Sequence, residues 1–270
     1  MSKISTLITA ASMSIVSAIG FIAVQASAAT TIKIATEGAW PPYNFVNDSG
    51  ELVGYEVDLM NEVCARMPGY KCEIVQQDWD GIIPGLLARK YDAIMADMSI
   101  TEERKRKVMF SDPYHLLPPL WVGKSNLGLS EPVSADQLSG LTVGCQGSTI
   151  FSNYLEDKMP NVPVKLYGKQ DEVELDLAAG RIDLFIADQV LSNTFLKSDA
   201  GKNFQAYGHP PQDPIFGIGT GVAMRKGETA MLFAFNGALA TVIQDGTMEQ
   251  LWQKWFKFSY VEPATRRTYE

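Results

Sequence analysis

The stretch DAIMADMSITEERKRKVMFSDPY, residues 92–114, sets the pattern on which the rest of the chain is organised. It begins with a short apolar strand at residues 93–95, breaks at Ala96-Asp97, and continues through a polar turn into a charged helix that carries Arg104. A guanidinium beside the end of a strand suits a carboxylate ligand, because arginine binds carboxylate in a bidentate fork. The hydroxyl of Ser99 could complete such a site. On this segment alone, a capped surface helix is the favoured interpretation.

Strands and amphipathic helices alternate before this stretch. Strands are predicted at residues 31–35 and 71–75, and helices at 56–67 and 82–88. This β-α-β-α-β series is the pattern of a doubly wound parallel sheet, in which ligands bind beyond the carboxyl ends of the strands. The polar and aromatic residues expected to cluster there are Glu37, Trp40, Trp79, Asp97 and Ser99.

A second α/β series follows an irregular tract that ends at Gly140. Its strands are predicted at residues 141–146, 164–167 and 182–187. The turn Gln146-Gly147-Ser148-Thr149 offers backbone amides and two hydroxyls to an anion, although an ordinary helix cap explains it equally well. Asp188 directly follows a buried strand, where a carboxylate needs either a helix to cap or a cationic partner.

The chain then returns through the glycine-rich run 217–221 into a strand at 222–224 and two helices at 228–243 and 248–256. This G-x-G-x-G run does not predict a nucleotide site, because it precedes a strand instead of following one. A serine-hydrolase elbow, a phosphate-binding loop and a dinucleotide fingerprint are absent from the sequence. His115 and His209 have no partner at metal-ligand spacing, so neither a metal nor a cofactor is expected.

Residues 1–28 have the features of a cleaved secretory signal, with Lys3 near the start, an uncharged run and a small-x-small site at 26–28. The net charge of −8 argues against nucleic acid or an anionic membrane as partner. In an exported chain, Cys64, Cys72 and Cys145 permit one disulfide and one free thiol. A short bridge from Cys64 to Cys72 is compatible with their positions, and Cys145 lies in an apolar strand.

The motifs resemble those of the periplasmic solute-binding proteins of polar-amino-acid ABC transporters, family 3, in particular the lysine/arginine/ornithine-, histidine- and opine-binding group. The resemblance covers nearly the whole mature chain. The passages that carry it are IKIATEGAWPPYNF, GYEVDLMNEVC, DWDGIIPGLLARKYDAIMADMSITEERKR, FSDPY, QGST, AGRIDLFIAD and QDGTMEQLWQKWF.

The resemblance implies a role for each candidate site residue. Arg104 would grip the ligand's α-carboxylate, assisted by Ser99, Thr149 and Ser148, and Asp188 would receive the α-ammonium. Trp40 and Trp79 would sandwich the ligand side chain, and Glu37 and Glu56 would meet a distal cation. Cys64 and Cys72 match the group's short-loop disulfide. The full set of expected ligand-binding residues is Glu37, Trp40, Glu56, Trp79, Ala96, Asp97, Ser99, Arg104, Gln146, Ser148, Thr149 and Asp188.

The resemblance also implies a two-lobed periplasmic binding protein fold of type II, each lobe a doubly wound sheet flanked by helices, joined by two crossing segments. We expect the signal peptide at residues 1–28, lobe 1 at 29–117 and 217–270, and lobe 2 at 118–216. The expected partners of this periplasmic monomer are an amino acid or opine and an inner-membrane permease. An exported dehydratase on the same scaffold and a protein delivering ligand to a sensory receptor are the alternatives.

Asp97 departs from the family pattern, in which many members carry a small residue. With Glu37, Glu56 and Asp188, it would set four acids against one arginine. Burying such an excess of negative charge is costly unless a cationic ligand enters or an acid is protonated. The sequence therefore predicts a ligand with net positive charge or many hydrogen-bond donors. Alternatively, Asp97 would bond sugar-like hydroxyls, as an opine would offer.

Overall fold

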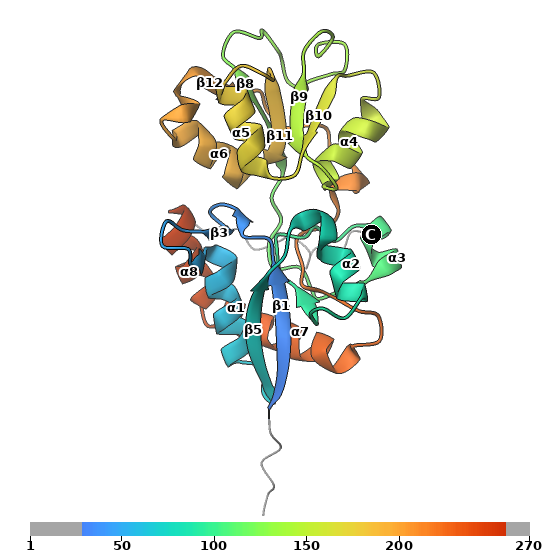
Figure 1. Ribbon diagram of the computed structural model, residues 1–270, viewed down its shortest axis with the longest axis vertical. Helices are drawn as coiled ribbons and strands as arrows, with labels where there is room; N and C mark the ends of the chain where they lie inside the picture. Colours follow the sequence, from blue (N-terminus) through green and yellow to red (C-terminus); the bar gives the residue numbers. More distant parts are fainter. Residues whose placement is uncertain (1–28, 258–270) are drawn as a thin grey trace, which may run out of the picture.

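The computed structural model of the protein describes residues 29–257, and the chain forms two α/β lobes stacked along the long axis of the molecule (Figure 1). The predicted signal peptide at 1–28 lies outside the described residues, as does the tail from residue 258. No helix in residues 29–257 is long and apolar enough to cross a membrane.

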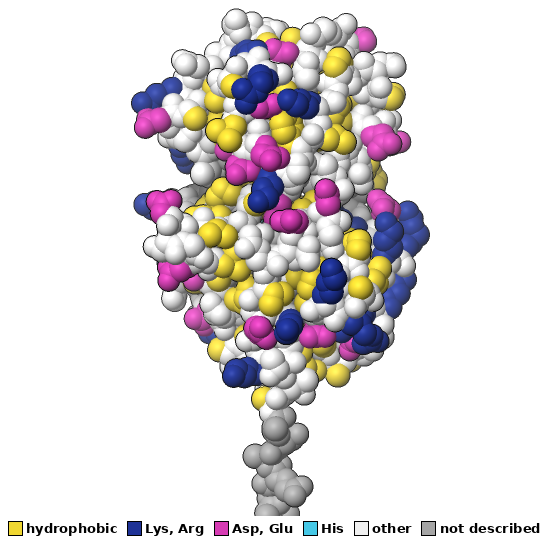
Figure 2. All heavy atoms as spheres, viewed as in Figure 1, with side chains coloured by type: hydrophobic (Ala, Val, Ile, Leu, Met, Phe, Trp, Pro, Cys, Tyr) yellow, Lys and Arg dark blue, Asp and Glu magenta, His cyan; other side chains and the backbone are white. Residues whose placement is uncertain are grey.

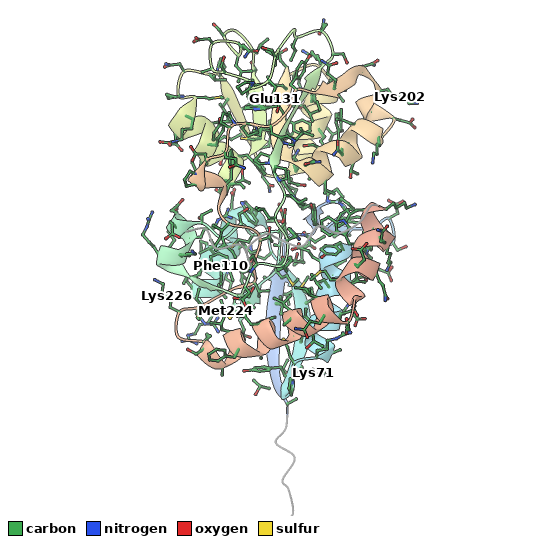
Figure 3. The ribbon with its side chains drawn as sticks, turned by 180° about the vertical axis from the view of Figure 1, so that it is seen from behind. Lys71, Phe110, Glu131, Lys202, Met224 and Lys226 are labelled. Carbon is green, nitrogen blue, oxygen red and sulfur yellow. A yellow bond between two sulfur atoms is a disulfide. The ribbon has the colours of Figure 1, made fainter. Side chains whose placement is uncertain are left out.

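Lobe 1, the lower lobe in Figure 1, is built on a five-stranded sheet of order β5-β1-β6-β13-β7. β1 runs parallel to both β5 and β6, and β13 runs antiparallel to β6 and β7. The strands are β1 (Thr30–Thr36), β5 (Tyr70–Gln76), β6 (Ala93–Ile94), β7 (Met109–Phe110) and β13 (Ala223–Met224). Seen from behind, Phe110 and Met224 lie in the same region of this sheet (Figure 3).

Helices cover this sheet because their apolar faces pack on it. The predicted apolar face at residues 56–67 is buried: Leu59 and Val63 lie in the helix α1, and Met67 lies just beyond its end. Burying a side chain of this size contributes roughly 1.5–3 kcal/mol. The helices of lobe 1 are α1 (Tyr55–Ala65), α2 (Ile82–Leu87), α3 (Glu102–Lys107), α7 (Thr229–Gln244) and α8 (Thr247–Phe256), with the 3-10 helix η1 at Trp79–Gly81.

Lobe 2 repeats the plan with a sheet of order β10-β9-β11-β8-β12. β9 pairs in parallel with β10 and β11, whereas β8 is antiparallel to β11 and β12. The strands are β8 (Pro119–Lys124), β9 (Val143–Gln146), β10 (Val164–Tyr167), β11 (Leu184–Asp188) and β12 (Phe204–Ala206). The helices are α4 (Ile150–Lys158), α5 (Gln170–Ala178), α6 (Gln189–Lys197), η2 (Ala200–Asn203) and η3 (Pro214–Phe216).

The two-lobed α/β fold is confirmed, but each sheet is mixed and not purely parallel. The parallel part of each lobe comes from the predicted β-α-β-α-β series, in which every strand is followed by a helix that carries the chain back. The antiparallel strands come from the chain crossing between lobes: β8 enters lobe 2 and β13 returns to lobe 1. A small three-stranded sheet follows β1 and consists of β2 (Ala39–Trp40), β3 (Asn44–Val46) and β4 (Leu52–Val53).

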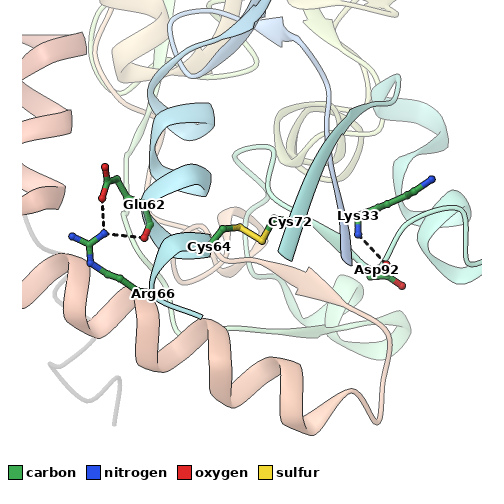
Figure 4. The surroundings of a disulfide bond; sticks show 6 residues. All are labelled: Lys33, Glu62, Cys64, Arg66, Cys72 and Asp92. Atoms are coloured by element: carbon green, nitrogen blue, oxygen red, sulfur yellow. Dashed lines mark hydrogen bonds and ion pairs between the residues drawn. A yellow bond between two sulfur atoms is a disulfide. The ribbon is translucent and has the colours of Figure 1, made fainter. Parts of the chain in front are cut away.

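A disulfide joins Cys64 and Cys72, which confirms the expected pairing (Figure 4). It ties the end of α1 to the start of β5, at the edge of lobe 1 opposite the carboxyl ends of the strands. Cys145 is a free, buried thiol on β9, and burial raises the pKa of this thiol to about 12. It therefore stays protonated and unreactive at neutral pH.

Two segments connect the lobes. The first runs from β7 to β8, and the second from η3 to β13. They are held side by side by backbone hydrogen bonds, from the N–H of Tyr114 to the carbonyl of Thr220 (2.9 Å) and from the N–H of Thr220 to the carbonyl of His115 (2.8 Å). The domain boundaries at residues 117/118 and 216/217 remain predictions.

Candidate functional site

A pocket lies between the lobes, where the carboxyl ends of the parallel strands of both sheets face each other. Most of the predicted binding residues line it: Glu37, Trp40, Trp79, Ala96, Asp97, Ser99, Arg104, Gln146, Thr149 and Asp188. Leu117, Ile150, Phe151 and Thr220 complete the wall. Figure 2 shows acidic side chains on both sides of the waist between the lobes.

Arg104 is the central cation of this pocket. It lies in the first turn of α3, whose N-cap Thr101 accepts a hydrogen bond from the N–H of Arg104. Its guanidinium donates to the backbone carbonyls of Ser99 (3.0 Å) and Ser148 (3.4 Å) and stacks on the ring of Trp79 at 5.2 Å. No carboxylate of the described residues forms an ion pair with Arg104, and burial lowers the pKa of this side chain to about 10, so it stays charged at neutral pH.

Asp188 belongs to lobe 2 and faces lobe 1, which carries Arg104. Its Oδ1 caps α6 by accepting the N–H groups of Val190 (2.8 Å) and Leu191 (3.0 Å), and also accepts the hydroxyl of Tyr43 at 3.2 Å. Its Oδ2 is buried and has no hydrogen-bond partner among the described residues. Burial raises the pKa of Asp188 to about 7, and the nearby Asp97 adds to this shift. An unpartnered buried carboxylate oxygen is costly and is a ready acceptor for a cation.

Glu37 connects the lobes on the far side of the pocket. Its Oε1 accepts a hydrogen bond of 2.6 Å from Nε2 of Gln146, which also donates to the carbonyl of Gly168 at 2.9 Å. Glu37 is 3% exposed, and burial raises its pKa to about 7. The carboxyl group has no cationic partner within ion-pair distance among residues 29–257, so this end of the pocket can also accept a positive charge.

Glu56 lies beneath the pocket and does not line it. Its carboxylate accepts the backbone N–H of Asp97 (2.8 and 2.9 Å), the side-chain amide of Asn44 (2.8 Å) and the hydroxyl of Tyr114. Burial raises the pKa of Glu56 to about 7, and Asp97 adds to the shift. In this conformation Glu56 holds the Asp97 loop, and its predicted contact with the ligand remains untested.

The aromatic and hydroxyl residues are also engaged within the protein. Trp79 donates its indole N–H to the carbonyl of Ser148 at 3.0 Å, which joins lobe 1 to lobe 2. Thr149 caps α4, and its hydroxyl donates to the carbonyl of Gln146 at 2.8 Å. Ser148 has a left-handed backbone (φ 58°) and presents its carbonyl to Arg104. The predicted hydroxyl contacts of Ser148 and Thr149 with a ligand therefore remain predictions.

The sequence already indicated the positions of the four additional lining residues. Leu117 and Thr220 belong to the two predicted crossing segments, and Ile150 and Phe151 directly follow the strand-to-helix turn. Segments that cross between two lobes border the cleft by necessity, so these positions were open to prediction. The pairing of His115 with Asp97 at 2.7 Å, in contrast, had no signal in the sequence.

The fold and the site together define a two-lobed solute-binding protein, with an interlobe pocket that offers one guanidinium without an acidic partner in residues 29–257 and several buried carboxyl groups. Residues 32–258 match the family described as bacterial extracellular solute-binding proteins, family 3, and the chain belongs to this family.

Individual relatives support this family assignment. The chain is 38% identical over 231 residues to the L-arginine-binding protein of Pseudomonas aeruginosa, covering 84% of this chain and 88% of that protein. It is 37% identical to the octopine-binding periplasmic protein of Rhizobium meliloti, covering 84% and 90%. A solved arginine-specific periplasmic binding protein of Salmonella typhimurium superposes with a TM-score of 0.77 at 30% identity, covering 84% and 100%. All three are named as binding proteins and not as enzymes.

Proposed function

We propose that this protein is the periplasmic substrate-binding component of an ABC importer, and that it binds a polar amino acid or amino-acid derivative with net positive charge. Arginine, lysine, ornithine, histidine and opines are the candidate ligands. The observation that carries the proposal is a pair of groups in the pocket that meet no opposite charge among the described residues. The guanidinium of Arg104 in lobe 1 bonds backbone carbonyls and no acid, and Oδ2 of Asp188 in lobe 2 has no hydrogen-bond partner.

These two groups suit the two ends of an α-amino acid. Arg104 has the bidentate geometry for an α-carboxylate and no competing acid in ion-pair contact among the described residues. Asp188 has one oxygen committed to the helix cap and one left for an ammonium group. Trp79 holds the guanidinium by stacking, so its ring orients Arg104 as well as bordering the ligand.

The balance of charge selects a cationic ligand. Glu37, Asp97 and Asp188 line the pocket with Arg104 as the cation among its lining residues. The raised pKa values of Glu37 and Asp188 mean that burial penalises their charged forms. A ligand with a second positive charge relieves this penalty, whereas a neutral aliphatic ligand leaves it in place. Glu37 lies across the pocket at a position that suits the distal cation.

Ligand binding would act by stabilising lobe closure. Hydrogen bonds already join the lobes, among them Tyr43 to Asp188, Gln146 to Glu37, and Trp79 to the carbonyl of Ser148. A ligand that touches Arg104 and Asp188 together binds the closed form better than the open form and shifts the equilibrium toward it. The closed protein then docks on a membrane permease.

Titration calorimetry on the mature protein tests this function with arginine, lysine, ornithine, histidine, octopine, glutamine and leucine. We expect the tightest binding for a cationic amino acid or the opine, and weak or no binding of leucine. Tightest binding of leucine would overturn the charge argument. Binding of none of these compounds would overturn the proposed function as a whole.

A further inference from the structure

His115 lies under the pocket, at the place where the two crossing segments meet. It belongs to the first segment, and its backbone carbonyl accepts the N–H of Thr220 from the second. A side chain on Gly219 would come within 2.8 Å of that carbonyl, and Gly219 has φ +121°, so glycine is required for this close approach. The backbone of His115 is therefore held against both crossing segments.

The imidazole holds one oxygen of Asp97. Its Nε2 lies 2.7 Å from Oδ1 of Asp97, and the hydroxyl of Thr220 donates to the same oxygen at 2.8 Å. A carboxylate only accepts hydrogen bonds, so Nε2 bears the hydrogen. Oδ2 of Asp97 has no hydrogen-bond partner among the described residues, and the side chain keeps 12% exposure toward the pocket that it lines.

The backbone of Asp97 is also constrained. Its φ of 47° is left-handed, which is uncommon for a residue other than glycine, and its N–H is bound by both oxygens of the Glu56 carboxylate. With the backbone fixed from one side and Oδ1 from the other, the remaining oxygen has one available direction. Strain of this kind persists where the surrounding contacts over-determine it, often at ligand sites.

A packing role alone does not account for the imidazole. The ring is buried among Tyr43, Tyr55, Tyr114 and Trp252, with centroid distances of 4.8–6.2 Å. Within residues 29–257 its Nδ1 is buried without a partner, which costs stability. A phenyl ring would fill this aromatic site without that cost. What the imidazole provides and a phenyl ring cannot is the hydrogen bond to Asp97.

We propose that His115 is a positioning residue of the ligand site: it anchors Oδ1 of Asp97 so that Oδ2 points at the positively charged part of the ligand. This inference rests on the proposed function, because it assigns the role of Asp97 in that same pocket. His115 does not touch the ligand. It sets the direction of a carboxylate that does.

Two substitutions separate the hydrogen bond from the packing. His115→Phe keeps an aromatic ring and removes the donor, and we expect it to weaken L-arginine binding about tenfold or more. His115→Gln places an amide N–H near the position of Nε2, and we expect its affinity to stay within about threefold of the unmodified protein. Equal losses in both variants, or arginine binding by His115→Phe within about twofold, would overturn the proposal.

A double-mutant cycle with Asp97→Asn gives a readout that a structural role would not produce. Asparagine tolerates the left-handed backbone, so Asp97→Asn preserves the loop. We expect His115→Phe to cause little further loss of arginine affinity in the Asp97→Asn background, because the oxygen that it positions has lost its charge. Additive losses would overturn the proposal. His209→Gln, a change at the other histidine, is the matched control and should leave the affinity unchanged.

A measurement without any change at position 115 covers the case in which His115→Phe does not fold. The sequence has two histidines, so ¹H–¹⁵N correlation spectra of the imidazoles contain two ring systems. We expect Asp97→Asn to shift the Nε2 resonance of His115 and to leave that of His209 in place. Unshifted His115 resonances would overturn the proposal. If the unmodified protein binds none of the ligand panel, the proposed function fails independently of this result.

Discussion

Replacing Asp188 with asparagine separates the two roles of this side chain, helix capping and charge. Oδ1 accepts the N–H groups of Val190 and Leu191 and the hydroxyl of Tyr43. The amide oxygen of asparagine can accept the same three hydrogen bonds. The amide nitrogen then takes the place of Oδ2, the oxygen that has no partner in residues 29–257.

The expected changes in stability and in arginine affinity follow from this exchange of an oxygen for an amide nitrogen. Asparagine and aspartate are about equally good N-caps, so we expect the capping contribution to the free energy of unfolding to change by less than about 0.5 kcal/mol. A ligand ammonium loses a charged acceptor and meets an amide donor instead. Hydrogen bonds to charged groups contribute about 1.5–3 kcal/mol, and each 1.4 kcal/mol is about tenfold in affinity, so arginine should bind roughly 10- to 150-fold more weakly.

Calorimetry with L-arginine and thermal unfolding of the ligand-free protein measure the two effects separately. Asp188→Ala is the control, because it removes the cap as well and should lower the free energy of unfolding by about 0.5–2 kcal/mol. If Asp188→Asn keeps its arginine affinity within threefold of the unmodified protein, Oδ2 does not receive the ligand and the reasoning fails.

Three further predictions follow from the geometry. Arg104→Ala should reduce arginine affinity by at least about 100-fold in calorimetry. The melting temperature should stay nearly unchanged, because in residues 29–257 the guanidinium bonds backbone carbonyls and no acid. An affinity within a few-fold of the unmodified protein would refute the carboxylate assignment. Burial raises the pKa of Glu37 from 4.5 to about 7, so the folded ligand-free protein holds more protons than the unfolded chain between these values. Its melting temperature should therefore fall as pH rises from 5 to 7.5. Glu37→Gln should make this slope shallower, with Glu56 and Asp188 accounting for the part that is left, and an equal slope in that variant would contradict the assignment. Replacing Cys64 and Cys72 together by serine opens a loop of separation 8 and should cost about 2.5 kcal/mol of unfolding free energy in denaturant titrations, with unchanged arginine affinity because the bridge lies at the edge of lobe 1 opposite the pocket.

Local patterns made much of the fold predictable. The helix at Tyr55–Ala65 was readable because Leu59 and Val63 recur at spacing four, and the paired cysteines lie at its end and at the start of the next strand. The strand-end position of Asp188 was readable because an apolar run stops at this charged residue, and the helix that carries Arg104 was readable because a polar turn and a charged segment follow the apolar strand. The antiparallel strands β8 and β13 were not distinguished from parallel ones, since direction depends on the path between lobes.

Parts of the site depended on contacts between distant segments. Glu56 resembled a ligand contact in sequence, yet its carboxylate is taken up by the Asp97 loop, 41 residues away. Asp97 in turn is held by His115, 18 residues on, and by Thr220, 123 residues on. No periodicity encodes such pairs, because they form only when the folded chain brings the two crossing segments together.

The sequence by itself determined the alternation of strands and helices, the excess of acids over the single site arginine and, through its motifs, the family and the disulfide that the family implies. These properties follow from periodicity, spacing and charge, which are local or additive. Only the tertiary structure decided which carboxylate oxygens are free. Oδ1 of Asp188 and of Asp97 are occupied by the protein, whereas their Oδ2 atoms have no partner in residues 29–257, because hydrogen bonding in a buried pocket depends on every group that the fold brings within reach.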